Sequence, residues 1–370
     1  MKKIDCAVFG ACASCVLGGE YGEQKTLKIE RTKELLGEFY AGEIEFFESE
    51  QTHFRSRAEF GLFHEGESIR YVMRGANGER VFIEKCAIVD DKIAALMPCL
   101  KSALEASEEL KFKIFGCEFV TTKREICAVL LYHRDVEQIK SPLAALHAKL
   151  GINCLVARSR GKKLVFGEEL LREELAVDGG EIRYVLSETS FIQPNRGVNE
   201  KMLSYAVRAV SGGRDLLELY CGHGNFTIPL SFKFENVLAT EINKSSIVKA
   251  LENARINGAN NIRFARMSAE EFVSALKGER EFHRLEGINL PGYDFSHVLV
   301  DPPRAGCDET VLNLIRNYEN IIYVSCSQET LARDLAALAS THEVRSLALF
   351  DQFAHTNHIE TIAVLLKISR

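Results

Sequence analysis

The chain has 370 residues, of which 46% are hydrophobic and 26% are charged, and its formal net charge is −6. This length predicts two or three domains with well-buried cores. No apolar run approaches the length of a membrane span, which argues against an integral membrane protein. The negative charge argues against a protein that coats nucleic acid without specificity, although it is compatible with a local basic groove.

The N-terminal stretch MKKIDCAVFGACASCVLGG combines two lysines with a mildly apolar segment. Asp5 and three cysteines interrupt that segment, so it does not match a signal peptide. The chain has eleven cysteines, and without a secretory signal we expect them to be reduced thiols in the cytoplasm.

A helix is predicted in YGEQKTLKIERTKELLGEFY, because apolar residues recur there at partly helical spacing with charges between them. Together with the cysteine-containing start, this helix makes up a first segment, residues 1–40. The expected apolar stripe consists of Leu27, Ile29, Leu35, Leu36 and Phe39.

Residues 41–190 mix strand and helix patterns. FRSRAEFGLFHEGESIRYVMR and CEFVTTKREICAVLLYHR each predict a pair of antiparallel strands, the first with a turn at residues 64–67. SPLAALHAKL predicts a short helix capped by Ser141, with Pro142 at its first helical position. More strand follows, with a turn at residues 178–180.

From about residue 195 the pattern changes to alternating helices and strands. This alternation predicts a largely parallel, doubly wound sheet. The last two strands have no helix between them, so we expect an antiparallel edge there. After the helical stretch NEKMLSYAVRAVS, the predicted strands are DLLELY, NVLATEI, NIRFARM, SHVLVDPP, NIIYVSC, EVRSLALF and ETIAVLLKI.

A Gly-rich turn follows the first of these strands in LLELYCGHGNFTIPL. Gly222 and Gly224 permit a sharp turn and a close approach to a ligand. Glu241, at the end of the next strand, can accept hydrogen bonds from both ribose hydroxyls of an adenosine. Thr227 stands where a dinucleotide pattern has its third glycine, so an adenosine ligand without phosphates, such as S-adenosylmethionine, fits better. The alternative is a plain strand-to-helix turn.

Two further strands end in residues that suggest chemistry. HVLVDPPRAG ends in a loop that two prolines stiffen, which can hold Asp301 at a fixed angle to a bound base or can be a purely structural turn. VSCSQETLARDL brings Cys326 to the same edge, where a helix begins. The helix N-terminus should lower the pKa of this thiol and favour a nucleophile, with Arg304 as a further source of positive charge. The alternative is a buried, inert thiol, which we prefer for most of the other cysteines.

The stretch LFDQFAHTNHIE precedes the last strand and carries four candidate general bases. Spacing alone does not choose among them: Asp351, His355, His358 and Glu360.

Together these stretches resemble the RNA 5-methyluridine methyltransferase family, and within it the tRNA (uracil-5-)-methyltransferases, over nearly the whole chain. The resemblance implies an α+β RNA-binding domain at 41–190 and a class I, Rossmann-like S-adenosylmethionine-dependent methyltransferase domain at 191–370. One departure is clear: the family motif S-C-N-P reads Ser325-Cys326-Ser327-Gln328 here. The matching segments are FRSRAEFGLFHEG, SFIQPN, DLLELYCGHGNF, LATEI, REFHRLEGI, VDPPRAG, YVSCSQETLARDL and LALFDQFAHTNHIE.

The resemblance implies methylation of uracil C5 in RNA, at the T-loop uridine 54 of tRNA, to give 5-methyluridine. Cys326 would attack C6 of the uracil, and Glu360 would remove the C5 proton, a task that suits a partly buried carboxylate with a raised pKa. The target base must be flipped out of its stack. The resemblance also implies that Gln193, Tyr220, Asn225, Glu241 and Asp301 contact S-adenosylmethionine or the uracil, and that Phe191 and Arg57 contact RNA.

The expected partner is therefore the T-arm of tRNA, with no membrane and no obligate protein partner indicated. Local basic residues should hold the RNA backbone even though the chain is acidic overall. The candidates are Arg55, Arg57, Arg70, Arg74, Arg158, Arg160, Lys162 and Lys163.

Three N-terminal cysteines, Cys6, Cys12 and Cys15, follow a C-x5-C-x2-C pattern, and Cys86 is a candidate fourth. Four thiolates could hold zinc or an iron–sulfur cluster. The pattern resembles the [4Fe–4S] ligand set of the family's ribosomal-RNA members. The alternative is a set of free thiols.

Two other functions stay open at this point. The same reaction on ribosomal RNA is favoured by the cysteines, but we see no small β-barrel RNA-binding domain ahead of the first helix, which favours tRNA. A noncatalytic tRNA-binding or tRNA-folding protein is opposed by the presence of both Cys326 and Glu360.

Overall fold

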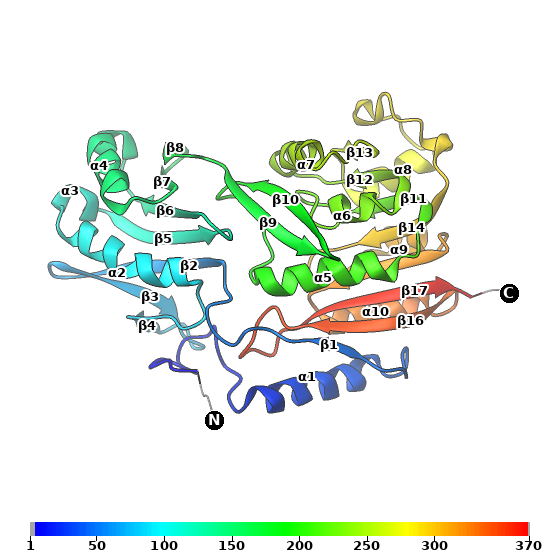
Figure 1. Ribbon diagram of the computed structural model, residues 1–370, viewed down its shortest axis with the longest axis horizontal. Helices are drawn as coiled ribbons and strands as arrows, with labels where there is room; N and C mark the ends of the chain where they lie inside the picture. Colours follow the sequence, from blue (N-terminus) through cyan, green and yellow to red (C-terminus); the bar gives the residue numbers. More distant parts are fainter. Residues whose placement is uncertain (1–3, 369–370) are drawn as a thin grey trace.

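The computed structural model describes residues 4–368, and its elements form two bodies that lie side by side along the long axis of the molecule (Figure 1). The seven-stranded body is built on a sheet with the order β4-β3-β2-β5-β6-β7-β8. The eight-stranded body has the order β1-β16-β17-β15-β14-β11-β12-β13. Within residues 4–368, no helix is long and apolar enough to cross a membrane.

The seven-stranded body contains both strand pairs predicted from the sequence. These pairs, β2–β3 and β5–β6, are antiparallel as expected, and β6 and β7 form the one parallel pairing of this sheet. The strands are β2 (Arg57–Glu65), β3 (Ser68–Arg74), β4 (Arg80–Ile83), β5 (Ile114–Thr121), β6 (Ile126–Tyr132), β7 (Cys154–Ser159) and β8 (Lys162–Gly167).

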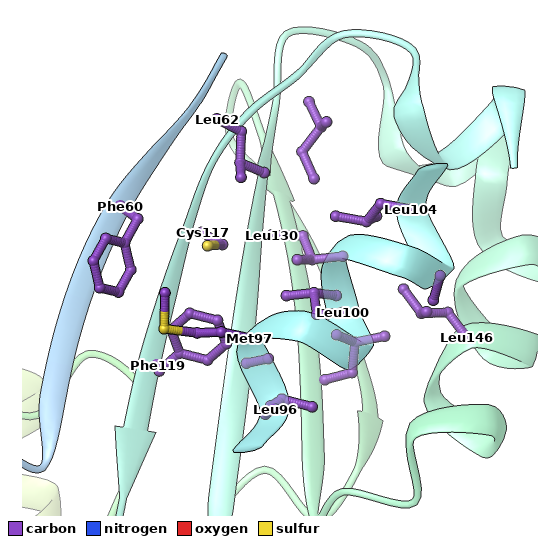
Figure 2. Packing of buried hydrophobic residues seen from close by; sticks show 14 of the residues in the cluster. Phe60, Leu62, Leu96, Met97, Leu100, Leu104, Cys117, Phe119, Leu130 and Leu146 are labelled. Carbon is purple, nitrogen blue, oxygen red and sulfur yellow. The ribbon is translucent and has the colours of Figure 1, made fainter. Parts of the chain in front are cut away.

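Three helices, α2 (Asp91–Glu105), α3 (Glu108–Lys111) and α4 (Lys140–Leu150), accompany this sheet. Strand residues alternate in burial, so one face of the sheet supplies apolar side chains to a single core. Figure 2 shows α2 packing into that core. The labelled residues are Leu96, Met97, Leu100 and Leu104 of α2, Leu146 of α4, and Phe60, Leu62, Cys117, Phe119 and Leu130 of the strands.

One predicted cap in this body is wrong. The structure gives α4 Ile139 as its N-cap, with no side-chain cap hydrogen bond, instead of Ser141. The reason is the short 3-10 helix η1 (Val136–Ile139), which runs directly into α4, so the chain is already helical before Ser141.

The eight-stranded body confirms the predicted doubly wound architecture. β17 runs antiparallel to both of its neighbours, as predicted for the end of the chain, but it is not an edge strand. It lies between β15 and β16, and β1 pairs with the outer side of β16 and covers that edge. The strands are β1 (Glu45–Phe47), β11 (Gly213–Leu219), β12 (Phe234–Thr240), β13 (Ile262–Ala265), β14 (Phe295–Val300), β15 (Asn320–Ser325), β16 (His342–Phe350) and β17 (Glu360–Lys367).

Helices lie between most of these strands. The helices are α1 (Tyr21–Leu36), α5 (Arg196–Ala209), α6 (Thr227–Ser231), α7 (Lys244–Ile256), α8 (Ala269–Leu276), α9 (Glu309–Ile315) and α10 (Gln328–Leu338), with the short η2 (His283–Leu285) and η3 (Leu290–Gly292) before β14.

The hairpin of β9 (Leu171–Val177) and β10 (Gly180–Leu186) connects the two bodies in the chain. Most of its apolar side chains belong to the core of the eight-stranded body, where Tyr184 is buried with residues of α5, whereas Leu171 packs with residues of β5, β6 and β7. The division of the chain at residues 40 and 190 stays a prediction. Sheet membership groups β1 with the eight-stranded body, and core membership groups most of β9 and β10 with it.

Helix α1 departs from the apolar stripe that the sequence predicted. Leu27 is 51% exposed, and of the five stripe residues Leu36 alone is buried. The other buried residues of this helix are polar: Gln24, Lys28 and Thr32, spaced four apart. The helix therefore turns a polar face toward the body that it packs on.

Candidate active site

Four of the predicted site residues follow directly after adjacent strands. Tyr220 follows β11, Glu241 follows β12, Asp301 follows β14 and Cys326 follows β15. These strands are parallel neighbours in the order β15-β14-β11-β12. Because the carboxyl ends of parallel strands meet at one edge, the fold collects these residues along one side of the sheet, where doubly wound proteins bind ligands.

Glu360 reaches the same place from the opposite direction. The antiparallel pairing of β15 with β17 ends at Ser325 and Thr361, so the next residues beyond that pair are Cys326 and Glu360. Glu360 is buried, and its charge acts on Cys326. The structure thus brings the predicted nucleophile and the predicted base together.

The ionisation of this group of residues differs from our expectation. Burial raises the pKa of Asp301 to about 7, and burial together with the nearby Asp301 raises the pKa of Glu360 to about 8. Burial, then the charges of Glu360 and Asp301, raises the pKa of Cys326 to about 11, against a smaller opposing effect of Arg304. The predicted lowering of this thiol pKa is wrong, because burial and two carboxylates outweigh the helix N-terminus.

A compact loop carries Cys326. The hydroxyl of Ser325 donates to the carbonyl of Ser327 (2.9 Å) and accepts from its amide (3.2 Å), which fixes the backbone on both sides of Cys326. Ser327 then caps α10, and Gln328 begins that helix. Cys326 lines a small polar cavity of about 90 Å³ that it shares with Arg31, Arg304 and His358.

The Gly-rich turn has the backbone geometry that a ligand-binding loop needs. Gly222 and Gly224 have φ angles of 56° and 88°, and Tyr220 also has a positive φ of 65°, which is uncommon for a residue with a side chain. The carboxylate of Glu241 accepts from the amides of Gly222 (3.1 Å) and Asn243 (2.7 Å). Glu241 therefore braces the turn.

Three buried side-chain oxygens beneath this turn have no hydrogen-bond partner among the described residues: those of Glu218, Thr227 and Thr240. Burial raises the pKa of Glu218 to about 8; the Thr227 hydroxyl is near enough to oppose this shift, although not in hydrogen-bonding geometry with the unpaired oxygen, and Asp301 adds to it. Such unpaired buried groups are rare and call for a ligand or water. Sequence reasoning missed Glu218, although an acid inside the apolar run LLELY was a signal.

Asn225 and Gln193 lie on the side of the turn that faces α5. The side chain of Asn225 exchanges two hydrogen bonds of 3.0 Å with Asn199. Gln193 and Asn225 line one narrow cavity of about 20 Å³. Gln193 also lines a much larger cavity, so it connects the cofactor turn with the space described next.

The large cavity has a volume of about 740 Å³ and is lined by residues of both bodies. Glu360, Gln193 and Phe191 line it, and Phe191 is 73% exposed. Arg57 lines it as well, but its guanidinium already donates to the carbonyl of Ser190 (3.1 Å) and to Glu118 (3.1 Å). Arg57 thus holds the segment that presents Phe191.

The four cysteines predicted as metal ligands line the same cavity: Cys6, Cys12, Cys15 and Cys86. Burial and then the neighbouring thiols raise the pKa of Cys15 to about 12. The thiols have therefore converged from distant parts of the sequence. Nevertheless, among residues 4–368 no group of three or more His, Cys, Asp or Glu side chains is arranged to hold a metal ion.

A second groove, of about 460 Å³, lies on the seven-stranded body. Phe115 and His133 stack there with ring centroids 4.0 Å apart, an aromatic pair that sequence reasoning missed. Of the basic residues that line the groove, Arg158, Lys162 and Lys163 each form an ion pair with an acidic side chain. Part of the positive charge of the groove is therefore neutralised locally. The basic residues that line this groove are Arg158, Arg160, Lys162 and Lys163.

Two other predicted RNA contacts, Arg70 and Arg74, lie on β3, outside this groove. Arg70 covers the ring of Phe82 at 3.9 Å. Arg55 lines the large cavity near the cysteines, and burial lowers its pKa. The predicted basic residues are therefore spread over three places rather than one.

Comparisons with known proteins agree over almost the full length. A family model described as tRNA (Uracil-5-)-methyltransferase matches residues 20–368. A tRNA/tmRNA (uracil-C(5))-methyltransferase of Campylobacter curvus is 51% identical over 365 residues, 98% of this chain and 99% of that protein. Its counterpart in Sulfurimonas denitrificans is 44% identical over 369 residues, 98% of this chain and 100% of that protein.

One solved structure has a similar fold. The crystal structure of Pyrococcus abyssi tRNA (uracil-54, C5)-methyltransferase in complex with S-adenosyl-L-homocysteine matches with a TM-score of 0.74. The two sequences are 22% identical, and the match covers 96% of this chain and 86% of that one. At this identity the likeness supports the arrangement of the two bodies and of the doubly wound sheet.

Proposed function

The chain belongs to the tRNA (uracil-5-)-methyltransferase family, and from that premise we propose that it methylates C5 of a uridine in tRNA, the T-loop uridine 54. The observation that carries this proposal is the adjacency of Cys326 and Glu360 at the sheet edge that also holds the Gly-rich turn. A thiol and a carboxyl in register are the two groups that methylation of an unactivated uracil carbon requires.

S-adenosylmethionine is the methyl donor in this proposal, and the residues at the turn fit it. The positive φ angles of Gly222 and Gly224 let the backbone approach a ligand, and Glu241 stands where an adenosine ribose would need an acceptor. When bound, the donor supplies an electrophilic methyl group on a positively charged sulfur. The residues that we propose to hold it are Gln193, Tyr220, Asn225, Glu241 and Asp301.

The chemistry assigned to the protein's own residues has two steps. Cys326 first loses its thiol proton to solvent, and the thiolate then bonds to C6. This bond moves the C5–C6 π electrons toward C5 and makes that carbon nucleophilic enough to take the methyl group. Glu360 then removes the C5 proton, the double bond re-forms and the C6–S bond breaks. The raised pKa of Glu360, about 8, makes it a stronger base than an exposed carboxylate.

RNA recognition is assigned to the large cavity and the basic groove. The T-loop uridine must leave its stack to reach Glu360, and exposed Phe191 offers a face on which the flipped base can pack. Arg57 supports this by holding Ser190, next to Phe191. Arg158, Arg160, Lys162 and Lys163 supply charge for the backbone, beside the stacked rings of Phe115 and His133.

We also propose that Cys6, Cys12, Cys15 and Cys86 hold a [4Fe–4S] cluster. The donors fit by kind and number, and all four line one cavity, although ligation would require them to move closer together. Anaerobic purification followed by iron and sulfide analysis tests this. A brown protein with four irons per chain would support the cluster, and a colourless, iron-free protein would end the idea.

The enzyme activity is tested by incubating the protein with S-adenosylmethionine labelled in its methyl group and with unmodified tRNA, ribosomal RNA or tmRNA in separate reactions. The proposal predicts label in tRNA as 5-methyluridine. tmRNA is included because the similar Campylobacter curvus protein is a tRNA/tmRNA (uracil-C(5))-methyltransferase. Label in ribosomal RNA alone would show that ribosomal RNA is the substrate. Label in no RNA would contradict the enzyme activity and favour a noncatalytic RNA-binding protein.

A further inference from the structure

The buried polar row of α1 connects two loops that the catalytic chemistry depends on. Gln24, Lys28 and Thr32 are each at most 4% exposed, and a spacing of four places them on one face of the helix. α1 runs alongside β1 and packs against α10, which follows Cys326 (Figure 1). Burying three polar side chains is costly unless each is hydrogen bonded, so their partners are informative.

The first two residues of the row hold the segment that leads into Glu360. Lys28 donates to the carboxylate of Asp351 (2.7 Å) and to the carbonyl of Phe353 (3.2 Å). The Gln24 side chain accepts from the amide of His355 (3.1 Å) and bonds its ring (3.2 Å). His355 has a positive φ of 66°, a conformation that these contacts help to maintain.

The third residue of the row, Thr32, holds the segment that follows Cys326. The Gln328 amide donates to the hydroxyl of Thr32 at 2.6 Å, and it lies 3.5 Å from the hydroxyl of Thr361. Thr32 donates its own proton to the carbonyl of Lys28 (2.8 Å), which leaves its oxygen free to accept. Gln328 is two residues after the nucleophile, and Thr361 is one residue after Glu360.

The helix itself does not need glutamine at this position. Gln328 is the first residue of α10, where a backbone amide has no partner inside the helix and proline is well tolerated. Ser327 is extended, with φ −139° and ψ 114°, as a residue before proline must be. Local structure thus permits the S-C-N-P motif of the relatives, and the amide of Gln328 is available for the contact with Thr32.

We propose that Gln328, held by Thr32 of α1, is a positioning residue that sets the place of Cys326 relative to Glu360. α1 then supports two segments at once: the loop that carries Cys326 and the segment that precedes Glu360. This inference rests on the proposed function, because it assigns a role within that reaction. It gives a physical reason for Gln328 at the place where the family motif S-C-N-P has its proline.

The test compares variants that differ in single hydrogen-bonding groups. Thr32→Val and Gln328→Met keep the shape of the side chain and remove the contact, whereas Thr32→Ser keeps the hydroxyl. Thr26→Val is the matched control, since Thr26 lies on the exposed face of the same helix and makes the same bond to the carbonyl four residues earlier (3.0 Å). Gln328→Pro also removes the hydrogen bond to Thr32, and the backbone at this position is compatible with proline.

The readouts are kcat and the two KM values for methylation of tRNA, and the single-turnover rate of covalent attachment to tRNA containing 5-fluorouridine. Fluorine at C5 cannot be removed as a proton, so the reaction stops before Cys326 is released. The attachment rate therefore reports the steps up to that point and does not depend on proton removal by Glu360. We expect Thr32→Val, Gln328→Met and Gln328→Pro to lower kcat and the attachment rate about tenfold with little change in either KM. Thr32→Ser and Thr26→Val should stay close to wild type.

The inference would be overturned if folded Thr32→Val and Gln328→Pro both kept kcat and the attachment rate within twofold of wild type. It would also be overturned if both KM values rose while kcat was unchanged, because that pattern indicates a binding role. Should Thr32→Val fail to fold, Gln328→Pro decides. An inactive wild-type protein would overturn the proposed function and this inference with it. An active wild type with unaffected variants would overturn this inference alone.

Discussion

At the scale of single residues, the reaction site is built at a cost to stability. Burial raises the pKa of Asp301, Glu360 and Glu218 to between about 7 and about 8, and Asp301 adds to the shift of the other two. Each carboxyl group therefore keeps its proton in the folded protein at pH values where an unfolded chain has released it. The same burial that suits Glu360 to its task as a base makes the fold sensitive to pH.

This sensitivity predicts a stability difference between wild type and Glu360→Gln. The folded pKa of Glu360 lies above its unfolded value of 4.5, so its contribution to stability is present below about pH 4.5 and is lost as the pH rises toward 8. Glutamine does not ionise, so the free energy of unfolding of the variant should rise relative to that of wild type as the pH increases. The expected rise is up to about 1.4 kcal/mol per pH unit over this range. Chemical denaturation of both proteins from pH 5 to pH 8 measures this.

Glu34→Gln, on the exposed side of α1, is the control for that comparison. Parallel stability curves for wild type and Glu360→Gln across the whole pH range would contradict the raised pKa of Glu360.

The thiol makes a separate prediction. Cys326→Ala should lower methyl transfer to tRNA by on the order of a thousandfold or more, because alanine cannot form the bond to C6 that we propose for this thiol. Cys99→Ala removes an exposed thiol of α2 and should leave the rate unchanged. Initial rates with labelled S-adenosylmethionine decide, and full activity of Cys326→Ala would exclude covalent catalysis by this residue.

At the scale of elements, a buried ion pair helps to hold α1, together with the apolar contact of Leu36. Lys28 and Asp351 form an ion pair of 2.7 Å in which both side chains are almost completely buried, and Asp351 also accepts from the hydroxyl of Tyr21 (2.8 Å). Burial lowers the pKa of Lys28, and the charge of Asp351 opposes that shift. Removing one partner of such a pair leaves the other charge uncompensated.

Lys28→Met should therefore destabilise the protein by about 3–5 kcal/mol. Lys25 is the matched control on the same helix: it pairs with Glu48 at 2.7 Å, but both side chains are substantially exposed. Lys25→Met should cost less than about 1 kcal/mol. Urea denaturation at pH 7 compares the two, and an equal cost for both variants would show that burial does not govern these pairs.

Elements with a plain periodic pattern could be predicted from the sequence, and elements governed by long-range contacts could not. The strands that end in Asp301 and Cys326 are apolar runs bounded by polar residues, and they were predicted correctly. α1 was recognised as a helix, but its buried face was misassigned because the partners of Lys28 and Thr32 lie some 300 residues away in the sequence. The pKa of Cys326 was misjudged for the same reason, since Glu360 and Asp301 act on it only once the sheet has formed.

At the scale of the whole molecule, the proposed function depends on the large cavity between the two bodies. Residues from both line the large cavity, where Glu360 of the catalytic sheet lies with Arg57 of the seven-stranded sheet. The sequence indicated both sets of residues, and the resemblance indicated their roles, but no local pattern could place the N-terminal cysteines in the same cavity. That placement requires the folded arrangement of both bodies.

The charge distribution over the molecule gives a prediction about binding. The net charge is −6, so we propose that local basic residues hold the tRNA, among them exposed Arg160 in the groove of the seven-stranded body. Arg160→Ala should weaken tRNA binding and reduce the slope of log Kd against log salt concentration by about 1. Arg214→Ala, exposed and outside both cavities, is the control. An unchanged slope for Arg160→Ala would remove the groove from the RNA interface.

The central claim is that Cys326 and Glu360 act in sequence on one uracil. The most direct test incubates Glu360→Gln with S-adenosylmethionine and unmodified tRNA and looks for protein bound covalently to RNA on a denaturing gel. Without the base the C5 proton stays in place, so we expect the adduct to accumulate in Glu360→Gln and to be missing from the double variant Cys326→Ala/Glu360→Gln. Free tRNA with normal 5-methyluridine formation by Glu360→Gln would contradict the account.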